Sequence, residues 1–217
     1  MRCPPKVSDQ HKEQRRLEIL QAAKRVFKRK GYERATMSDI VSESGLSRGG
    51  VYWHFSDKEA LLTALFEHLS QQLVQDVSSL AQRHPSAWSA LEAFIEGSKQ
   101  DVLRQSDDPD AASVVEFFVS GWRDENRRRF AVGRYQQGTE QLRLLVQHGV
   151  ESGEFRPRVE PMTIVQGMVS FLDALHQSTF FLGPGILDIE GHIALVKDFL
   201  RYSLGIQASP PEGLPHP

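Results

Sequence analysis

The chain has 217 residues, a formal net charge of −2 and a single cysteine, and a quarter of its residues are charged. A chain of this length can bury a stable core without disulfides or metals, and one cysteine excludes an internal disulfide. No apolar run approaches the roughly 20 residues that span a bilayer, and the N-terminus lacks a signal peptide's apolar core, so we expect a cytoplasmic protein with no membrane partner.

Charge is distributed unevenly along the chain. Residues 1–60 hold 13 Lys and Arg against 8 Asp and Glu, whereas residues 61–217 hold 13 against 20. A basic segment joined to an acidic body favours a polyanion-binding module attached to a domain with another task.

Apolar residues recur at helical spacing, and neither an alternating strand nor an internal repeat is found. This pattern predicts an all-α fold of about nine helices. The predicted helices are 13–29, 37–44, 48–55, 59–82, 86–105, 111–124, 125–152, 160–181 and 188–204. The predicted segments are a flexible arm (1–12), a DNA-binding domain (13–58), a ligand-binding and dimerisation domain (59–205) and a flexible proline-rich tail (206–217).

Capping signals support the early helix boundaries. Thr36 and Ser47 are suitable N-caps for the second and third helices, and Gly45 separates the two. Ser56 and Glu59 have the spacing of a capping box, which predicts the start of the fourth helix.

Three helices within the first sixty residues, with the second and third short and joined by a glycine turn, predict a helix-turn-helix. Ile40 and Val41 can pack inward, and Gly45 can adopt the positive φ of the turn. Leu46 and Val51 can seal the second helix against the third.

The third predicted helix has an unusual composition for a purely structural element. It presents Arg48, Gly49, Gly50, Tyr52, Trp53 and His54. Two adjacent glycines each cost about 1 kcal/mol relative to alanine inside a helix. Close approach to a nucleic-acid backbone would explain them, because missing side chains let the helix enter the major groove while Arg48 reaches a guanine edge or a phosphate.

The aromatic residues of this helix have two explanations. Tyr52, Trp53 and Phe55 could be core aromatics, and we favour that explanation for Phe55. For Tyr52 and His54 we favour phosphate contact, with Lys58 beside them, and for Trp53 both explanations stay open.

Residue types in this region recur at fixed offsets. They are Gly31-Tyr32, Thr36-Met37, Asp39-Ile40-Val41, Gly45-Leu46-Ser47-Arg48-Gly49, Val51-Tyr52-Trp53-His54-Phe55 and Lys58-Glu59-Ala60-Leu61. In these motifs, residues 13–66 closely resemble the N-terminal domain of TetR/AcrR-family transcriptional regulators. The resemblance implies phosphate contacts by Thr36, Ser47, Tyr52, His54 and Lys58, and base-facing positions for Arg48, Gly49 and Gly50. The rest of the chain is similar to such regulators in helical layout and in the turn at 153–156.

The last two predicted helices are apolar on nearly all sides, so we expect a core to cover one face and a second copy of the chain the other. This predicts a C2 homodimer, as the resemblance also implies. The predicted dimer contacts are Met162, Val165, Val169, Leu172, Ile189, Ile193, Val196 and Leu200.

The acidic part of the chain is rich in aromatic residues, which could line an apolar cavity for a small-molecule effector. Each aromatic residue taken alone is better explained as core packing. The predicted effector-binding residues are Trp88, Phe94, Phe117, Phe118, Trp122, Tyr135, Asp173, His176 and Phe180.

Two further patterns bear on function. The basic run at 127–129 follows Asp124 and Glu125, and we favour a solvated, salt-bridged helix face over a second DNA contact. The eight histidines lack metal-ligand spacing, and no phosphate loop or nucleophile elbow is found, so we expect no metal, no cofactor and no enzyme activity.

Together these features predict a ligand-responsive, dimeric DNA-binding transcriptional regulator, for which we favour repression of a pseudopalindromic double-stranded operator. The resemblance implies that a small hydrophobic effector moves the helix over 59–82 and spoils the spacing of the two DNA-binding domains. The alternative is a helical small-molecule-binding or enzymatic domain whose N-terminal bundle docks a protein. An activator is a third possibility, because promoter position decides the sign of regulation.

Overall fold

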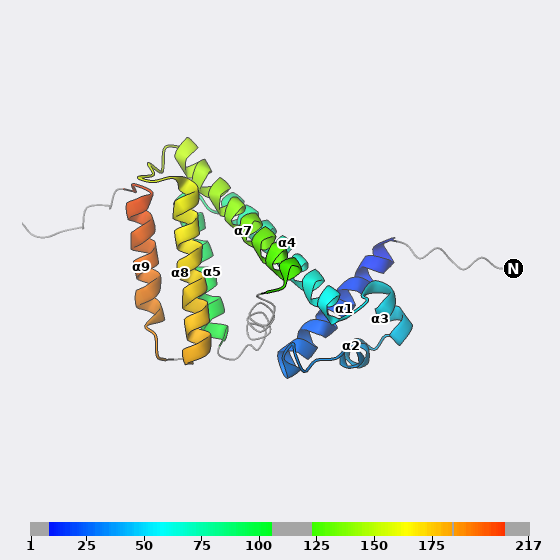
Figure 1. Ribbon diagram of the computed structural model, residues 1–217. Helices are drawn as coiled ribbons and strands as arrows, with labels where there is room; N and C mark the ends of the chain where they lie inside the picture. Colours follow the sequence, from blue (N-terminus) through cyan, green and yellow to red (C-terminus); the bar gives the residue numbers. More distant parts are fainter. Residues whose placement is uncertain (1–8, 106–122, 184, 207–217) are drawn as a thin grey trace, which may run out of the picture. The chain divides into compact units, whose positions relative to one another are not determined.

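The computed structural model describes residues 9–105, 123–183 and 185–206 (Figure 1). These residues form eight α-helices and no strand, which confirms the all-α prediction. The helices are α1 (Asp9–Lys30), α2 (Met37–Ser44), α3 (Arg48–His54), α4 (Lys58–Arg83), α5 (Ala87–Gln105), α7 (Glu125–Glu151), α8 (Pro161–Leu182) and α9 (Ile189–Ser203).

Three predicted segments differ from the structure or lie outside it. The first helix begins at Asp9, inside the segment predicted as a flexible arm. The helix predicted over 111–124 lies outside the described residues except for positions 123 and 124, which are not helical. Most of the predicted tail, 207–217, also lies outside them.

The chain divides into two compact units. The N-terminal unit comprises residues 1–72 and 107–134, and the C-terminal unit comprises residues 73–106 and 135–217. Both α4 and α7 therefore contribute residues to each unit. The reason is packing, because Leu61, Leu62, Leu65 and Phe66 of α4 belong to the N-terminal core.

The N-terminal core forms around one face of α1. Ile19, Leu20, Ala23, Val26 and Phe27 are each no more than 1% exposed. Their spacing of three and four residues places them on one side of the helix, where they pack against α2, α3 and the start of α4.

Local hydrogen bonds set the ends of the short helices. Thr36 forms a capping box with Asp39 at the start of α2, and Gly45 ends that helix with a φ of 67°. The predicted capping box at the start of α4 is wrong. Asp57 supplies the cap instead, since its Oδ1 accepts from the backbone N–H of Ala60 (2.8 Å).

In the C-terminal unit, α5, α8 and α9 lie side by side (Figure 1). Helices α5 and α9 run antiparallel, because Glu92 pairs with Arg201 (3.0 Å) and Lys99 pairs with Glu190 (3.1 Å). Between residues 9 and 206, leaving aside the undescribed gaps, no helix is long and apolar enough to cross a membrane.

The turn after α7 joins distant parts of this unit. Glu154 accepts hydrogen bonds from the backbone N–H groups of Ala87 (2.8 Å) and Trp88 (2.9 Å), and so caps α5 from 67 residues away. Phe155 is 2% exposed and packs directly on Gly149, where a Cβ would lie 2.2 Å from its ring.

Candidate nucleic-acid interface

Helix α3 is held to the N-terminal core by two residues four positions apart. Val51 is fully buried and Phe55, its C-cap, is 5% exposed. This confirms the core assignment of Phe55. The opposite side of α3 faces outward, with Tyr52 39% and Trp53 67% exposed, and the burial of Trp53 is too low for a core residue.

Arg48 and Tyr52 lie one turn apart on this outward side. The guanidinium carbon of Arg48 is 5.3 Å from the centre of the Tyr52 ring. A cation–π contact of this kind orients the guanidinium and leaves its N–H groups available to an acceptor.

The two adjacent glycines of α3 have different surroundings. A Cβ on Gly49 would meet nothing within 4 Å, whereas a Cβ on Gly50 would lie 3.2 Å from the hydroxyl of Ser47. That hydroxyl caps the helix by accepting from the backbone N–H of Gly50 (3.1 Å). Contacts within the protein therefore partly explain why position 50 is glycine, but they do not explain why position 49 is.

His54 is half-buried at the end of α3, with its ring edge-on to Trp53 at 4.6 Å between centroids. Burial lowers the pKa of the His54 imidazole, nearby Arg16 lowers it further, and Glu13 partly opposes them. The ring is therefore largely neutral at pH 7, when it can donate one hydrogen bond and accept another.

Thr36 lies at the start of α2 and is exposed. Its hydroxyl donates to Asp39 Oδ2 (2.8 Å) and accepts from the Asp39 backbone N–H (3.2 Å). Hydrogen bonds, first from Lys30 and then from Thr36, lower the pKa of Asp39 to about 2. Thr36 therefore has a capping role within the protein, whatever else it contacts.

Lys58 is half-buried and is bound within the protein. Its Nζ donates to the backbone carbonyls of Tyr32 (2.7 Å) and Glu33 (3.1 Å), and it lies 4.3 Å from the centre of the Tyr32 ring. An ammonium has three donors, so one remains for a phosphate.

Part of the positive charge of the N-terminal segment stabilises helix packing. Arg25 and Arg29 both bind Glu43 of α2 (2.8 and 3.1 Å), and Lys30 binds Asp39 (2.6 Å). The uneven charge that the sequence shows is therefore not all available to a polyanion.

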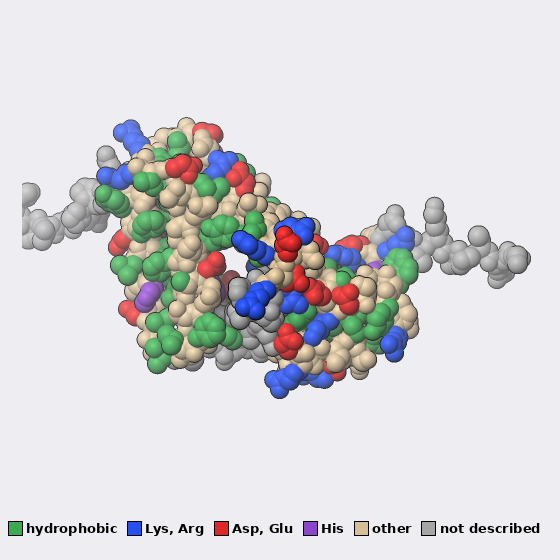
Figure 2. Space-filling view, viewed as in Figure 1, with side chains coloured by type: hydrophobic (Ala, Val, Ile, Leu, Met, Phe, Trp, Pro, Cys, Tyr) green, Lys and Arg blue, Asp and Glu red, His purple; other side chains and the backbone are tan. Residues whose placement is uncertain are grey.

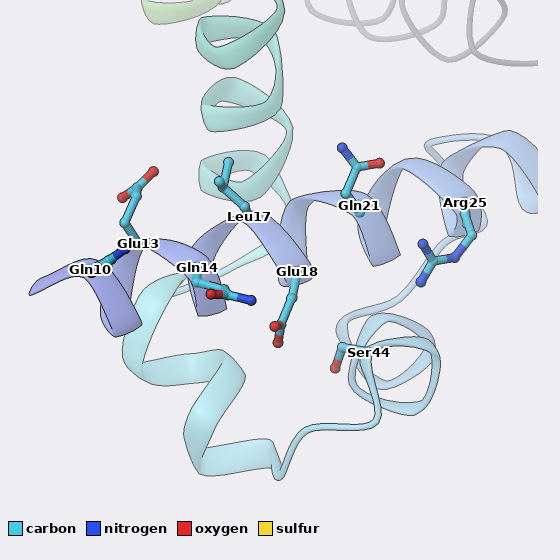
Figure 3. Close-up of a pocket in the computed structure, with 8 residues that line it drawn as sticks. All are labelled: Gln10, Glu13, Gln14, Leu17, Glu18, Gln21, Arg25 and Ser44. Atoms are coloured by element: carbon cyan, nitrogen blue, oxygen red, sulfur yellow. The ribbon is translucent and has the colours of Figure 1, made fainter. Parts of the chain in front are cut away.

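An open groove of about 790 Å³ runs along α1 on this unit (Figure 3). Its lining residues are Gln10, Glu13, Gln14, Leu17, Glu18, Gln21, Arg25 and Ser44. None of them is a predicted DNA- or effector-binding residue, and the two carboxylates of the groove, Glu13 and Glu18, pair with Arg16 and Arg15.

The structure does not bring all the predicted effector residues together. Trp88 lies at the end of the helical layer where Arg201 covers its ring at 4.9 Å. Phe180 lies near the C-terminal end of α8, which the chain joins to the start of α9. Glu190 at the start of α9 pairs with Lys99 toward the C-terminal end of α5, so Phe180 and Trp88 lie at opposite ends of these helices. One small pocket cannot include both.

The other predicted effector residues have mixed surroundings. Phe94 is half-buried against the core, His176 is half-buried with Nδ1 2.9 Å from the Leu172 carbonyl, and Tyr135 and Asp173 are exposed. Phe117, Phe118 and Trp122 lie outside the described residues.

Most of the predicted dimer contacts lie inside the subunit. Val165, Leu172, Ile193, Val196 and Leu200 are buried in its own core, because α8 and α9 direct these residues toward α5 and each other. Met162, Val169 and Ile189 are half-buried.

A different apolar set is exposed on the same two helices. Figure 2 shows hydrophobic side chains on the outer face of α8 and α9. Phe171 (37%), Leu195 (61%), Phe199 (46%) and Tyr202 (67%) are exposed there, and Phe199 covers the position where a Cβ of Gly167 would lie. The sequence indicated that α8 and α9 are apolar on two sides, but not which side is exposed.

Sequence reasoning missed the partner of Arg127. Asp124 caps α7, accepting from the backbone N–H groups of Asn126 (2.8 Å) and Arg127 (3.0 Å). Arg127 instead binds Glu59, 68 residues away. No local pattern could identify this partner, although Arg127, Phe130 and Arg134 share one face of a helix by their spacing.

No group of three or more potential metal ligands is found within the described parts of the chain. Comparison with known proteins gives matches to two family models. Residues 19–65 match the model for bacterial regulatory proteins of the tetR family, and residues 90–190 match the tetracyclin repressor-like C-terminal domain.

Relatives with known sequences include the uncharacterized HTH-type transcriptional regulator YfiR of Bacillus subtilis, which is 36% identical over 198 residues, covering 91% of this chain and 95% of that protein. An HTH-type transcriptional repressor of Mycobacterium tuberculosis is 46% identical over 61 residues, or 28% of this chain and 33% of that protein.

Solved structures share the fold at low sequence identity. A TetR transcription regulator from Haloarcula marismortui has a TM-score of 0.75 at 18% identity, and FadR from Bacillus subtilis, solved with stearoyl-CoA, has 0.65 at 19%. Each alignment covers 88% of this chain and 99% of the other.

Proposed function

The chain belongs to the TetR family of bacterial regulatory proteins and is a ligand-responsive DNA-binding transcriptional regulator, and we propose that it is a dimeric cytoplasmic repressor that leaves its operator when a small hydrophobic effector binds. The observation that carries the DNA-binding mode is the outward side of α3. A short helix anchored by Val51 and Phe55 presents an arginine, an unobstructed glycine and two exposed aromatic residues.

In the proposed complex, α3 enters the major groove and Arg48 reaches a base edge, with Gly49 allowing close approach. Tyr52, His54 and the free donor of Lys58 contact phosphates. Ser47 and Thr36, which cap the two helices, position these groups and meet the phosphates at the edge of the interface. Trp53, given its exposure, contacts the sugar-phosphate backbone.

The exposed apolar set on α8 and α9 supports a homodimer. Four large apolar side chains on two neighbouring helices form a surface that a second copy would cover around a two-fold axis. Two DNA-binding units would then contact half-sites one helical turn or a multiple apart.

Dimerisation can be tested by light scattering with the double variant Leu195→Glu/Phe199→Glu. We expect its mass to fall to that of the 24.5 kDa monomer. Leu144→Glu, which alters an exposed leucine on α7, is the matched control and should stay dimeric. A double variant with the wild-type mass would contradict this surface.

The effector would bind among the apolar side chains of the C-terminal unit, with Trp88 or Phe180 but not both in contact with it. It can release the operator only by binding more tightly to the state that does not bind DNA. A typical coupling of about 1 to 3 kcal/mol would weaken operator affinity roughly 5- to 150-fold.

Duplex DNA binding over a range of salt concentrations tests the function itself. Wild type should select a pseudopalindrome from random duplexes, and Arg48→Ala should mainly reduce discrimination between sites. Arg104→Ala, an exposed arginine on α5, removes the same charge from the other unit and should leave discrimination intact. If wild type shows no salt-dependent duplex binding, the protein-docking alternative replaces this proposal.

A further inference from the structure

The run Arg127-Arg128-Arg129 contains one residue unlike its neighbours. The Arg127 side chain is 16% exposed, and its guanidinium forms a two-pronged contact with Glu59, Nε to Oε1 at 3.0 Å and Nη2 to Oε2 at 3.1 Å. Arg128 and Arg129 are exposed, and Arg129 donates to the nearby Asn126 side chain (3.1 Å). A planar fork on a carboxylate fixes distance and orientation together, which a single-point contact does not.

The ring of Tyr32 joins this pair to the helix-turn-helix. Tyr32 is 3% exposed, and the Arg127 guanidinium lies 5.8 Å from its centre. Lys58 contacts the same ring and holds the turn between α1 and α2 through the two carbonyls described above. The first turn of α7, the first turn of α4 and the turn after α1 thus form one cluster.

The contact continues along α7. Phe130 stacks on Phe66 with centroids 6.1 Å apart, and the Arg134 guanidinium lies 5.7 Å from the same Phe66 ring. Arg127, Phe130 and Arg134 are spaced three and four residues apart, so they lie on one helix face. That face packs within the N-terminal unit over about two turns.

The same helix then enters the other unit. From Tyr135 onward α7 belongs to the C-terminal unit, and Leu142, Leu145 and Val146 are buried in its core. The helix-turn-helix therefore has two continuous helical connections to that unit, α4 and α7.

We propose that the Arg127–Glu59 pair on Tyr32 fixes the helix-turn-helix on the first turns of α7 in the orientation required by the operator, with Arg127 as a positioning residue that does not touch DNA. This inference rests on the proposed function. It follows that an effector could release the operator by loosening this attachment of α7 as well as by moving α4.

The test compares full-length Arg127→Gln with Arg128→Gln, which removes the same charge one residue away. The DNA probes are the duplex selected by wild type, the same duplex with one base pair inserted between the half-sites, and an unrelated duplex. Arg127→Gln should lose about 5- to 150-fold in affinity for the selected duplex. Its affinity for the unrelated duplex should match that of Arg128→Gln.

The penalty for the inserted base pair gives the decisive reading. This penalty is the affinity for the selected duplex divided by the affinity for the duplex with the inserted base pair. A loosened DNA-binding unit tolerates altered spacing, so the ratio should be at least about fivefold lower in Arg127→Gln than in wild type and unchanged in Arg128→Gln. Because this ratio compares two duplexes with the same protein preparation, an unfolded fraction lowers both affinities equally and cancels in the ratio. Glu59→Gln should reproduce the effect, and combining it with Arg127→Gln should add nothing.

Equal spacing penalties in Arg127→Gln, Arg128→Gln and wild type would overturn the inference while leaving the proposed function intact. Equal losses of Arg127→Gln on all three duplexes would overturn it as well. Arg127→Lys keeps the charge without the fork and should lie between wild type and Arg127→Gln. The absence of salt-dependent binding by wild type would instead overturn the proposed function.

Discussion

The caps that begin α2 and α3 and the contacts that hold α5 in the C-terminal unit have very different sequence ranges. At α2 and α3 the capping groups Thr36 and Ser47 bond to residues only three positions away. In the C-terminal unit, Glu154 caps α5 across 67 residues and Arg201 binds Glu92 across 109. Local caps are visible as sequence patterns, whereas long-range contacts depend on the fold being already formed.

The largest expected effect concerns the contact of Phe155 with Gly149. A Cβ on Gly149 would overlap the Phe155 ring at 2.2 Å, so Gly149→Ala should lower the free energy of unfolding by about 2 to 3 kcal/mol. Gly97→Ala, on α5 of the same unit with nothing within 4 Å, should instead raise it by up to about 1 kcal/mol. Chemical denaturation measures both, and equal shifts would show that this contact does not hold the turn.

The long-range cap should have the next largest effect. Glu154→Ala leaves two backbone N–H groups of α5 without their acceptor and should cost about 1 to 2 kcal/mol of unfolding free energy. Glu151→Ala removes an exposed carboxylate three residues earlier and should change stability by less than about 0.5 kcal/mol. If the two variants have the same free energy of unfolding, Glu154 does not stabilise α5 as a cap.

In the N-terminal unit, Gly49→Ala should separate stability from DNA binding. Because a Cβ there meets nothing, the substitution should stabilise the protein by about 0.5 to 1 kcal/mol. The same methyl group should weaken operator binding if α3 approaches DNA closely. Melting curves and DNA titrations on one preparation test both effects, and unchanged affinity would exclude close approach at Gly49.

The smallest expected effect is a pH dependence at His54. Since the pKa of folded His54 lies below its ordinary value of 6.5, the unfolded chain binds the proton more readily. The stability that His54 contributes is therefore present above about pH 6.5 and lost as the pH falls, and His54→Gln should lack this loss in denaturation at pH 7.5 and 5.5.

DNA should have the opposite linkage at the same residue. A phosphate beside His54 favours the protonated ring, so operator affinity should rise as pH falls, by at most about tenfold per unit. The difference between wild type and His54→Gln isolates this contribution from other groups. An identical pH profile for the two proteins would exclude phosphate contact.

Much of the N-terminal unit could be predicted from the sequence. The bounds of α2, its N-cap Thr36, the turn at Gly45 and the buried position of Phe55 follow from residue patterns within a few positions. Such features depend on local backbone geometry and helical periodicity, which a sequence records directly. The helix-turn-helix was predictable for the same reason, whereas local patterns did not decide whether Trp53 is buried or exposed.

The tertiary structure alone decided which side of each apolar helix is covered and which charges meet. Periodicity marks α8 and α9 as apolar on two sides, but only the packing of α5 determines that Leu172 is buried and Phe199 exposed. Likewise Arg127 has acidic neighbours in sequence, yet its partner is Glu59, because α7 docks on α4. Side-chain partners far apart in the chain depend on how helices pack, and local periodicity carries no record of that.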